Sequence, residues 1–134
     1  TGVQASLLAA EVFLERGLLL EPLPRADQEV ETVSYTSGAY AAVPRLGELR
    51  NSLLYGDIWE RPLLSKRDRS LITIAALAAL YRTNQLEMNT RRALEHGVTK
   101  DEIGEVFMHM AFYAGWPTAV NAFEVAKKVF DEQG

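Results

Sequence analysis

The fold is decided between residues 65 and 80, where the chain reads SKRDRSLITIAALAAL. Ser65 followed three residues later by Asp68 has the spacing of a capping box, which predicts that a helix begins here. From Leu71 onward the segment is apolar on nearly every side, and a helix of this kind belongs at the centre of a bundle. We therefore expect residues 65–80 to form a central helix that is buried all round.

The segments around this helix carry helical patterns of their own. Pro44 suits the first turn of a helix, and leucines follow it at helical spacing until Gly56 interrupts them. Residues 84–96 are expected to form the helix after the central one, and Gly97 ends it. The predicted inward stripe of that helix consists of Leu86, Asn89, Ala93 and Leu94.

The end of the chain predicts two more helices. Thr99 with Glu102 forms a better capping box than the first, and it opens a helix that runs to about residue 114. Pro117 stands where a first-turn proline belongs and starts the final helix. The side chains that the final helix is expected to bury are Val120, Phe123 and Phe130.

Residues 1–43 are predicted to form an N-terminal helix and a connector, to which no role is assigned. Apolar residues recur at helical spacing between residues 3 and 14, and two closely spaced prolines follow. Residues 27–43 fit a short helix or a turn. The chain is therefore predicted to be all-α, a bundle of six to seven helices whose main domain covers residues 44–134.

Composition and charge narrow the classes of function. The 134 residues contain 14 basic and 18 acidic side chains, and the net charge of −4 argues against nucleic acid or an anionic membrane as a partner. Cysteine is absent, which excludes disulfides, cysteine-based zinc sites and thiol redox chemistry. The longest nearly uninterrupted apolar stretch, residues 71–81, is shorter than the roughly 20 residues that span a bilayer. We expect a soluble, cytoplasmic protein.

The familiar local motifs do not identify a chemistry. The sequence has no G-x-G-x-x-G, G-x-x-x-x-G-K-[ST], G-x-S-x-G or H-E-x-x-H, so nucleotide binding and serine hydrolysis lose their usual support. The two histidines, His96 and His109, are separated by a helix break and offer no ligand cluster, so no metal is expected. His96 stands beside Gly97, where an imidazole suits a helix C-terminus, and we expect it to cap that helix.

The helix after Thr99 holds the first candidate site. Glu105, His109 and Tyr113 are spaced by four and share one face, beside a core stripe of apolar residues. A carboxylate one turn from an imidazole can fix its tautomer and raise its basicity, as an acid/base histidine requires. The same spacing also fits a pair that merely lies on the helix surface.

Two further polar residues have both a structural and a functional interpretation. Asn89 lies among apolar side chains and must find hydrogen-bond partners, so it either holds a substrate oxygen or ties two helices together. Arg69 lies in the first turn of the central helix, where a cation opposes the helix dipole. It either clamps a substrate carboxylate or makes an interhelical salt bridge.

Several motifs in order and spacing resemble one known family. They are YGDIWERP at 55–62, RDRSLITIAALAAL at 67–80, RALEHGVTKDEI at 92–103, AFYAGWP at 111–117, and Asn121 with Ala122. Over roughly residues 44–130 these stretches resemble the carboxymuconolactone decarboxylase family. The resemblance implies an all-helical fold shared with alkylhydroperoxidase D and assembly into homo-oligomers, often trimers or hexamers. It also implies the reaction of the namesake, which converts 4-carboxymuconolactone to 3-oxoadipate enol-lactone and carbon dioxide without a cofactor.

The redox branch of that superfamily has a different set of side chains at its active site. Where it carries two cysteines, a histidine and an upstream glutamate, this chain carries Arg82, Gln85, Asn89 and Ser70. The peroxidase machinery is therefore not expected here. Many decarboxylase-like members have histidine at the position of Asn89, so an acid/base function there has either moved, with His109 as the candidate, or been lost.

The resulting hypothesis is a cofactor-independent lyase that acts on a small carboxylated lactone or oxo acid. Arg69 would engage a carboxylate, Asn89 a carbonyl or enolate oxygen, and His109, oriented by Glu105, would carry the proton. Further candidates for substrate binding are Glu87, Tyr113 and Trp116. The alternative is a family member without decarboxylase activity, acting as an isomerase, a cyclase or an oligomeric binding protein.

The expected partners are a small acidic molecule and further copies of the same chain. A trimer or hexamer is predicted because a small domain that exposes several large apolar side chains would otherwise leave extended apolar patches in water. These side chains are Trp59, Tyr113, Trp116 and Leu18 to Leu20.

Overall fold

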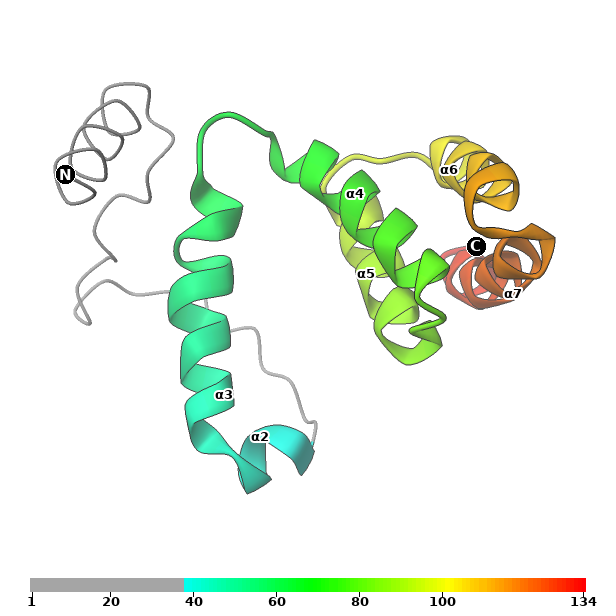
Figure 1. The fold of residues 1–134 in the computed structure, drawn as a ribbon. Coiled ribbons are helices and arrows are strands. Elements are labelled where there is room, and N and C mark those ends of the chain that lie inside the picture. Colours follow the sequence, from blue (N-terminus) through cyan, green and yellow to red (C-terminus); the bar gives the residue numbers. More distant parts are fainter. Residues whose placement is uncertain (1–37) are drawn as a thin grey trace, which may run out of the picture. The chain divides into compact units, whose positions relative to one another are not determined.

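The computed structural model describes residues 38–134, so the expected helix and connector before residue 38 lie outside the described residues. The chain divides into two compact units, with the boundary between Arg61 and Pro62. Residues 38–134 contain six α-helices and no strand, which confirms the all-α prediction (Figure 1). Within this range no helix is long and apolar enough to cross a membrane.

In the described part of the first unit, one nearly continuous helical run dominates (Figure 1). The predicted helix from Pro44 to Gly56 is confirmed, although its second half has the wider π-helical turn. Gly56 ends this turn, where an added Cβ would lie only 2.7 Å from the carbonyl oxygen of Ser52. The elements are α2 (Gly38–Ala42), α3 (Pro44–Leu49), the π-helix η1 (Arg50–Tyr55) and the 3₁₀-helix η2 (Ile58–Glu60).

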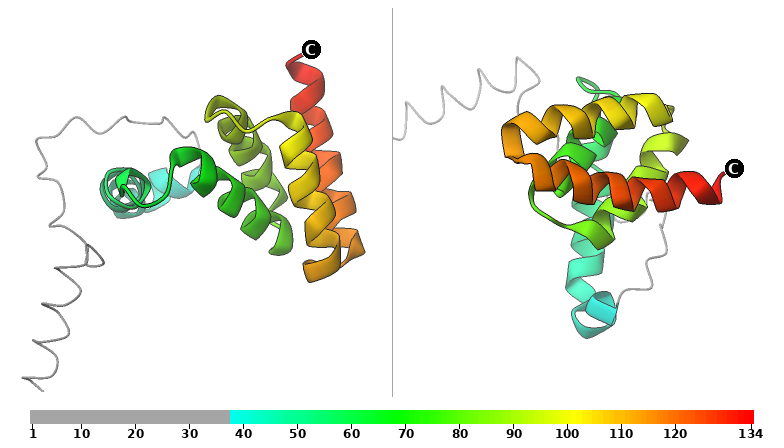
Figure 2. Two further views of the ribbon diagram at one scale, coloured as in Figure 1. Left: turned by 90° about the horizontal axis from the view of Figure 1, so that it is seen from above. Right: turned by 90° about the vertical axis from the view of Figure 1, so that its right-hand side faces the viewer.

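The second unit is a bundle of two antiparallel helix pairs (Figure 2). Its elements are α4 (Lys66–Ala79), α5 (Thr83–Glu95), α6 (Lys100–Ala114) and α7 (Trp116–Glu132). α4 pairs with α5 and α6 pairs with α7, while α4 also packs on α6 and α7, and α5 on α7. α4 therefore touches every other helix of this unit.

Both predicted capping residues cap their helices. The Ser65 hydroxyl accepts a hydrogen bond of 3.0 Å from the Asp68 backbone N–H at the start of α4. At the start of α6 the full capping box forms, since Thr99 accepts from the Glu102 N–H at 3.1 Å and Glu102 accepts from the Thr99 N–H at 2.9 Å. These local bonds explain why both helix starts could be predicted.

The prediction that α4 is buried all round is wrong. Ser70, Ile74 and Ala78 form one buried stripe, whereas Ile72 is 56% exposed and Leu80, which caps the helix, is 61% exposed. α4 is thus amphipathic, and part of its apolar surface faces outward.

The prediction of which face of α7 is buried is also wrong, because a different side of the helix faces the core. Val120 and Phe123 are 47% and 42% exposed, and Phe130 is half-buried against the core. Small residues pack inward instead, since they let α7 approach its neighbours closely. The buried apolar residues of α7 are Ala119, Ala122, Val125, Ala126 and Val129.

Trp59 does not contribute to an exposed apolar patch, contrary to the sequence-based expectation. It lies in η2, is only 8% exposed, and has its ring 6.0 Å from that of Tyr55. Tyr113 and Trp116, in contrast, are 77% and 68% exposed, as expected.

The turn between α6 and α7 should depend on Gly115. Its backbone has φ 105° and ψ 149°, a region that side-chain-bearing residues avoid at a cost of about 1–3 kcal/mol. We expect Gly115→Ala to lower the free energy of unfolding by about this amount, measured by urea denaturation.

Gly104 offers the matched control inside α6. A Cβ there would meet only the Phe123 ring edge at 4.0 Å, an ordinary contact, and alanine in a helix interior is favoured over glycine by about 0.5–1 kcal/mol. Gly104→Ala should therefore be neutral or stabilising. Equal losses in both variants would contradict this explanation of Gly115.

Candidate functional site

An open pocket of about 500 Å³ lies between α4 and α6. α4 contributes an aliphatic wall, and α6 contributes two aliphatic and two polar side chains. The lining residues are Leu71, Ile72, Ala75, Glu105, Val106, His109 and Met110. Among the described residues that line it, Glu105 and His109 are the polar ones, so a ligand here meets one carboxylate, one imidazole and apolar surface.

The sequence of α6 explains why these two side chains reach the pocket. Ile103 and Phe107 are fully buried and fix which side of the helix faces the core. Glu105 follows Ile103 by two residues, and His109 follows Phe107 by two residues. Both Glu105 and His109 are exposed. Because they are four residues apart, they project from the same face about one turn from each other.

Tyr113 continues this face but does not line the pocket. Its ring lies against that of His109, with 4.6 Å between centroids and 29° between planes, which is a stacked arrangement. Tyr113 therefore contacts the imidazole and not the pocket itself.

Three other candidates lie away from the pocket. Asn89 is 8% exposed on α5, and its side-chain amide donates to the backbone carbonyl of Gln85 at 2.8 Å. Glu87 accepts a 2.9 Å hydrogen bond from Arg91, a residue that also pairs with a carboxylate of α7. Trp116 packs edge-on against the ring of Phe112 at 6.3 Å. The structure does not bring these three together with His109.

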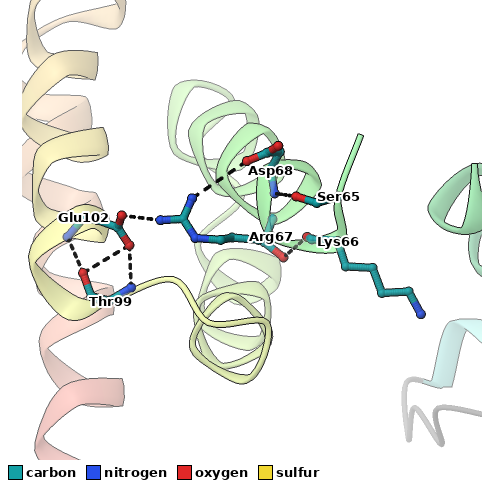
Figure 3. A network of polar contacts seen from close by, with 7 residues as sticks. Ser65, Lys66, Arg67, Asp68, Thr99 and Glu102 are labelled. Carbon is teal, nitrogen blue, oxygen red and sulfur yellow. Dashed lines mark hydrogen bonds and ion pairs between the residues drawn. The ribbon is translucent and has the colours of Figure 1, made fainter. Parts of the chain in front are cut away.

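Arg69 is half-buried and lies one helical turn before Ile72, at the edge of the α4 wall. It does not line the pocket. Its neighbour Arg67 makes an interhelical salt bridge with Glu102 on α6 (Figure 3). The hydrogen bond from the Thr99 backbone N–H, together with Arg67, lowers the pKa of Glu102.

His96 does more than cap a helix, and this role was missed in the sequence. Its Nδ1 lies 2.8 Å from the hydroxyl oxygen of Ser70, which is 2% exposed on α4. The Ser70 hydroxyl also donates to the Lys66 carbonyl at 2.9 Å, so Ser70 connects the first residue of α4 with the imidazole at the end of α5.

The surroundings of His96 favour its neutral form. Burial lowers the pKa of the imidazole, and the positive charges of Arg92 and Lys66 lower it further against the opposing charge of Glu95. In the structure Ser70 is the polar member of the buried stripe of α4. Nothing local, however, pointed from Ser70 to a residue 26 positions away.

Residues 38–134 contain no group of three or more histidine, aspartate or glutamate side chains placed to hold a metal ion.

The lowered pKa of His96 predicts how stability depends on pH. The unfolded chain binds this proton near pH 6.5, whereas the folded protein binds it only at lower pH. Between the two values the unfolded state holds more protons, so acidification through this window favours unfolding. We expect the contribution of neutral His96 to the free energy of unfolding to be complete above pH 6.5 and to be lost as the pH falls below this value. Urea denaturation at a series of pH values measures it.

Two variants test the origin of this effect. His96→Gln should remove this part of the pH dependence, and Arg92→Gln should move the window closer to pH 6.5 because one repelling cation is lost. Identical pH profiles for the wild type and His96→Gln would refute the assignment.

The chain is similar to known proteins. The family model that matches the chain is described as the carboxymuconolactone decarboxylase family and covers residues 44–128. A 4-carboxymuconolactone decarboxylase of Acinetobacter baylyi is 44% identical over 80 residues, which make up 60% of this chain and 60% of that protein. A nitrosuccinic acid decarboxylase of Metarhizium robertsii is 34% identical over 85 residues, 63% of this chain and 59% of that protein. The chain thus spans about three fifths of the length of these two relatives.

A third relative carries no assigned activity. It is an uncharacterized 15.0 kDa protein of Paracoccus denitrificans, 32% identical over 93 residues, which cover 68% of this chain and 69% of that protein. All of the residues that line the pocket fall within the stretch that the family model matches.

Proposed function

Since the chain belongs to the carboxymuconolactone decarboxylase family, we propose that it catalyses the loss of carbon dioxide from a small carboxylated lactone or oxo acid without a cofactor. The observation that carries this proposal is the pocket between α4 and α6, where one imidazole and one carboxylate face an aliphatic wall. The names of two relatives, both decarboxylases of small acids, support the class of substrate.

The proposed reaction needs few protein groups. When the bond between the substrate carbon and its carboxylate breaks, the electron pair stays on the substrate and is delocalised into an adjacent carbonyl or unsaturated system. His109 then donates a proton to that carbon and is reprotonated from solvent. Glu105, one turn away on the same helix face, lines the same pocket as His109. The aliphatic side chains Leu71 and Ile72 limit the water around the departing carboxylate.

A second carboxylate on the substrate needs a different partner. Arg69 is the cation of α4 that is nearest in sequence to the pocket wall, about 4.5 Å along the helix axis from Ile72. We propose that Arg69 binds the second carboxylate of the substrate, which the product retains. Asn89 is left with a structural role in this proposal, because its amide bonds within α5 and it does not line the pocket.

One observation favours a second candidate function. No lysine or arginine is among the described side chains that line the pocket, so the pocket itself lacks a clamp for a carboxylate. A Glu–His pair beside an apolar wall can also move a proton between two carbons, which is the reaction of an isomerase. The two functions differ in whether carbon dioxide leaves.

The direct assay supplies purified protein with 4-carboxymuconolactone, or with nitrosuccinate, and measures release of carbon dioxide against heat-inactivated protein. Release above the control supports the decarboxylase. Incorporation of deuterium from D₂O into a substrate that keeps its carboxylate would support the isomerase instead.

His109 should be the residue on which turnover depends most. We expect His109→Gln to lower kcat by a factor of about 10² to 10⁴, the usual contribution of general acid–base catalysis, while the helical circular dichroism signal is unchanged. Glu105→Gln should cost less, because the imidazole is still present. Glu124→Gln, which neutralises an exposed carboxylate on α7, serves as the control and should retain full activity. Full turnover in His109→Gln would rule out the acid/base assignment.

We also propose that the chain assembles into a homo-oligomer of three or six copies. α6 and α7 expose large apolar side chains near their shared turn, and a patch of this kind usually meets a partner. Its members are Met108, Phe112, Tyr113, Trp116, Val120 and Phe123. Light scattering at micromolar concentration should give three or six times the 14.9 kDa of one chain, and a mass of one chain would contradict the proposal.

A further inference from the structure

The ring of Tyr113 covers one face of the His109 imidazole, although Tyr113 itself lies outside the pocket. A substrate in the pocket would therefore meet His109 without meeting Tyr113. Because of this placement Tyr113 does not act as a substrate-binding residue, and an effect of its ring on the reaction is exerted through His109.

An exposed histidine on a helix normally exchanges among side-chain conformations. The proton that His109 would carry leaves from a ring nitrogen, in the plane of the imidazole, so its direction depends on how the ring is turned. A second ring stacked on the first, with 4.6 Å between the ring centroids and 29° between the planes, restricts that rotation. The stack covers one ring face and leaves uncovered by Tyr113 the ring edge, which carries both nitrogens.

From this geometry we propose that Tyr113 is a positioning residue, which holds the His109 imidazole in one orientation so that a ring nitrogen faces the pocket. The inference rests on the proposed proton transfer by His109. It assigns the effect to the aromatic ring and not to the hydroxyl, because the contact is ring on ring.

The first arm of the test observes the stack without any substrate. The chain has two histidines, so carbon–proton NMR resolves the His109 ring signals once His96→Gln has identified the others. Stacking on Tyr113 should shift the His109 ring protons upfield. Tyr113→Phe should keep this shift and Tyr113→Leu should remove it.

The second arm measures turnover with the substrate identified above. Tyr113→Leu should lower kcat about 10- to 100-fold, as expected for a misdirected catalytic group, and leave KM within about twofold because Tyr113 does not line the pocket. Tyr113→Phe should restore kcat to near the wild-type value. In the His109→Gln background, Tyr113→Leu should cost nothing further, because the two residues act as one unit.

The control is Phe112→Leu, which alters the neighbouring side chain of α6. Phe112 is 78% exposed, as Tyr113 is 77% exposed, but its ring packs on Trp116 and not on His109. Phe112→Leu should leave the His109 signals unchanged, because the ring of Phe112 does not stack on the imidazole. Circular dichroism and light scattering on every variant exclude unfolding or a changed assembly as the cause.

The outcomes distinguish Tyr113 from the function that it serves. A wild-type kcat in Tyr113→Leu, a raised KM with an unchanged kcat, an equal loss in Tyr113→Phe, or an additive loss with His109→Gln would each overturn the positioning role. If the wild type releases no carbon dioxide and exchanges no deuterium, the proposed function fails. The NMR arm then decides the positioning of His109 by itself, and an absent upfield shift overturns it.

Discussion

The N-terminal part of α4 is bonded to the next two helices. Ser70 contacts the imidazole at the end of α5. Arg67 pairs with the carboxylate of Glu102 at the start of α6 (Figure 3). Glu102 at the same time completes the capping box of α6, so one carboxylate serves the helix start and the interhelical pair. Because α4 and α6 form the two walls of the pocket, the pair of Arg67 and Glu102 links these walls at one end.

Features that depend on neighbouring residues could be predicted from the sequence. The starts of α4 and α6, the ends at Gly56 and Gly97, and the all-α class all follow from contacts within a few positions. The inner face of α7 could not be predicted this way, since size and hydrophobicity favoured Val120 and Phe123. The bundle instead selected alanines, because close packing of helices depends on the shape of the partner and not on the hydrophobicity of one residue.

The same distinction between local and distant contacts holds for the candidate site. Glu105 and His109 could be paired from their spacing, because both stand on one helix face. The bond between Ser70 and His96 spans 26 positions and that between Arg67 and Glu102 spans 35, so neither leaves a local pattern. Arg67 illustrates the limit, because the composition of the first turn of α4 does not reveal that this side chain reaches across to α6. The aliphatic wall of the pocket was likewise hidden, since α4 looked like a helix that is buried all round.

The small side chains on the inner face of α7 have a consequence for how such a site can change over evolutionary time. Ala122 and Ala126 belong to the same core cluster as Ile103 and Phe107, the residues that seat α6. A protein interior at crystal-like density has no spare volume, so a methylene added at either alanine acts as a wedge beneath α6. Such a wedge would tilt the helix that carries His109 relative to α4. Substitutions that never touch a ligand could thus widen or narrow the pocket, and a lineage could alter its choice of substrate from the inside of the bundle.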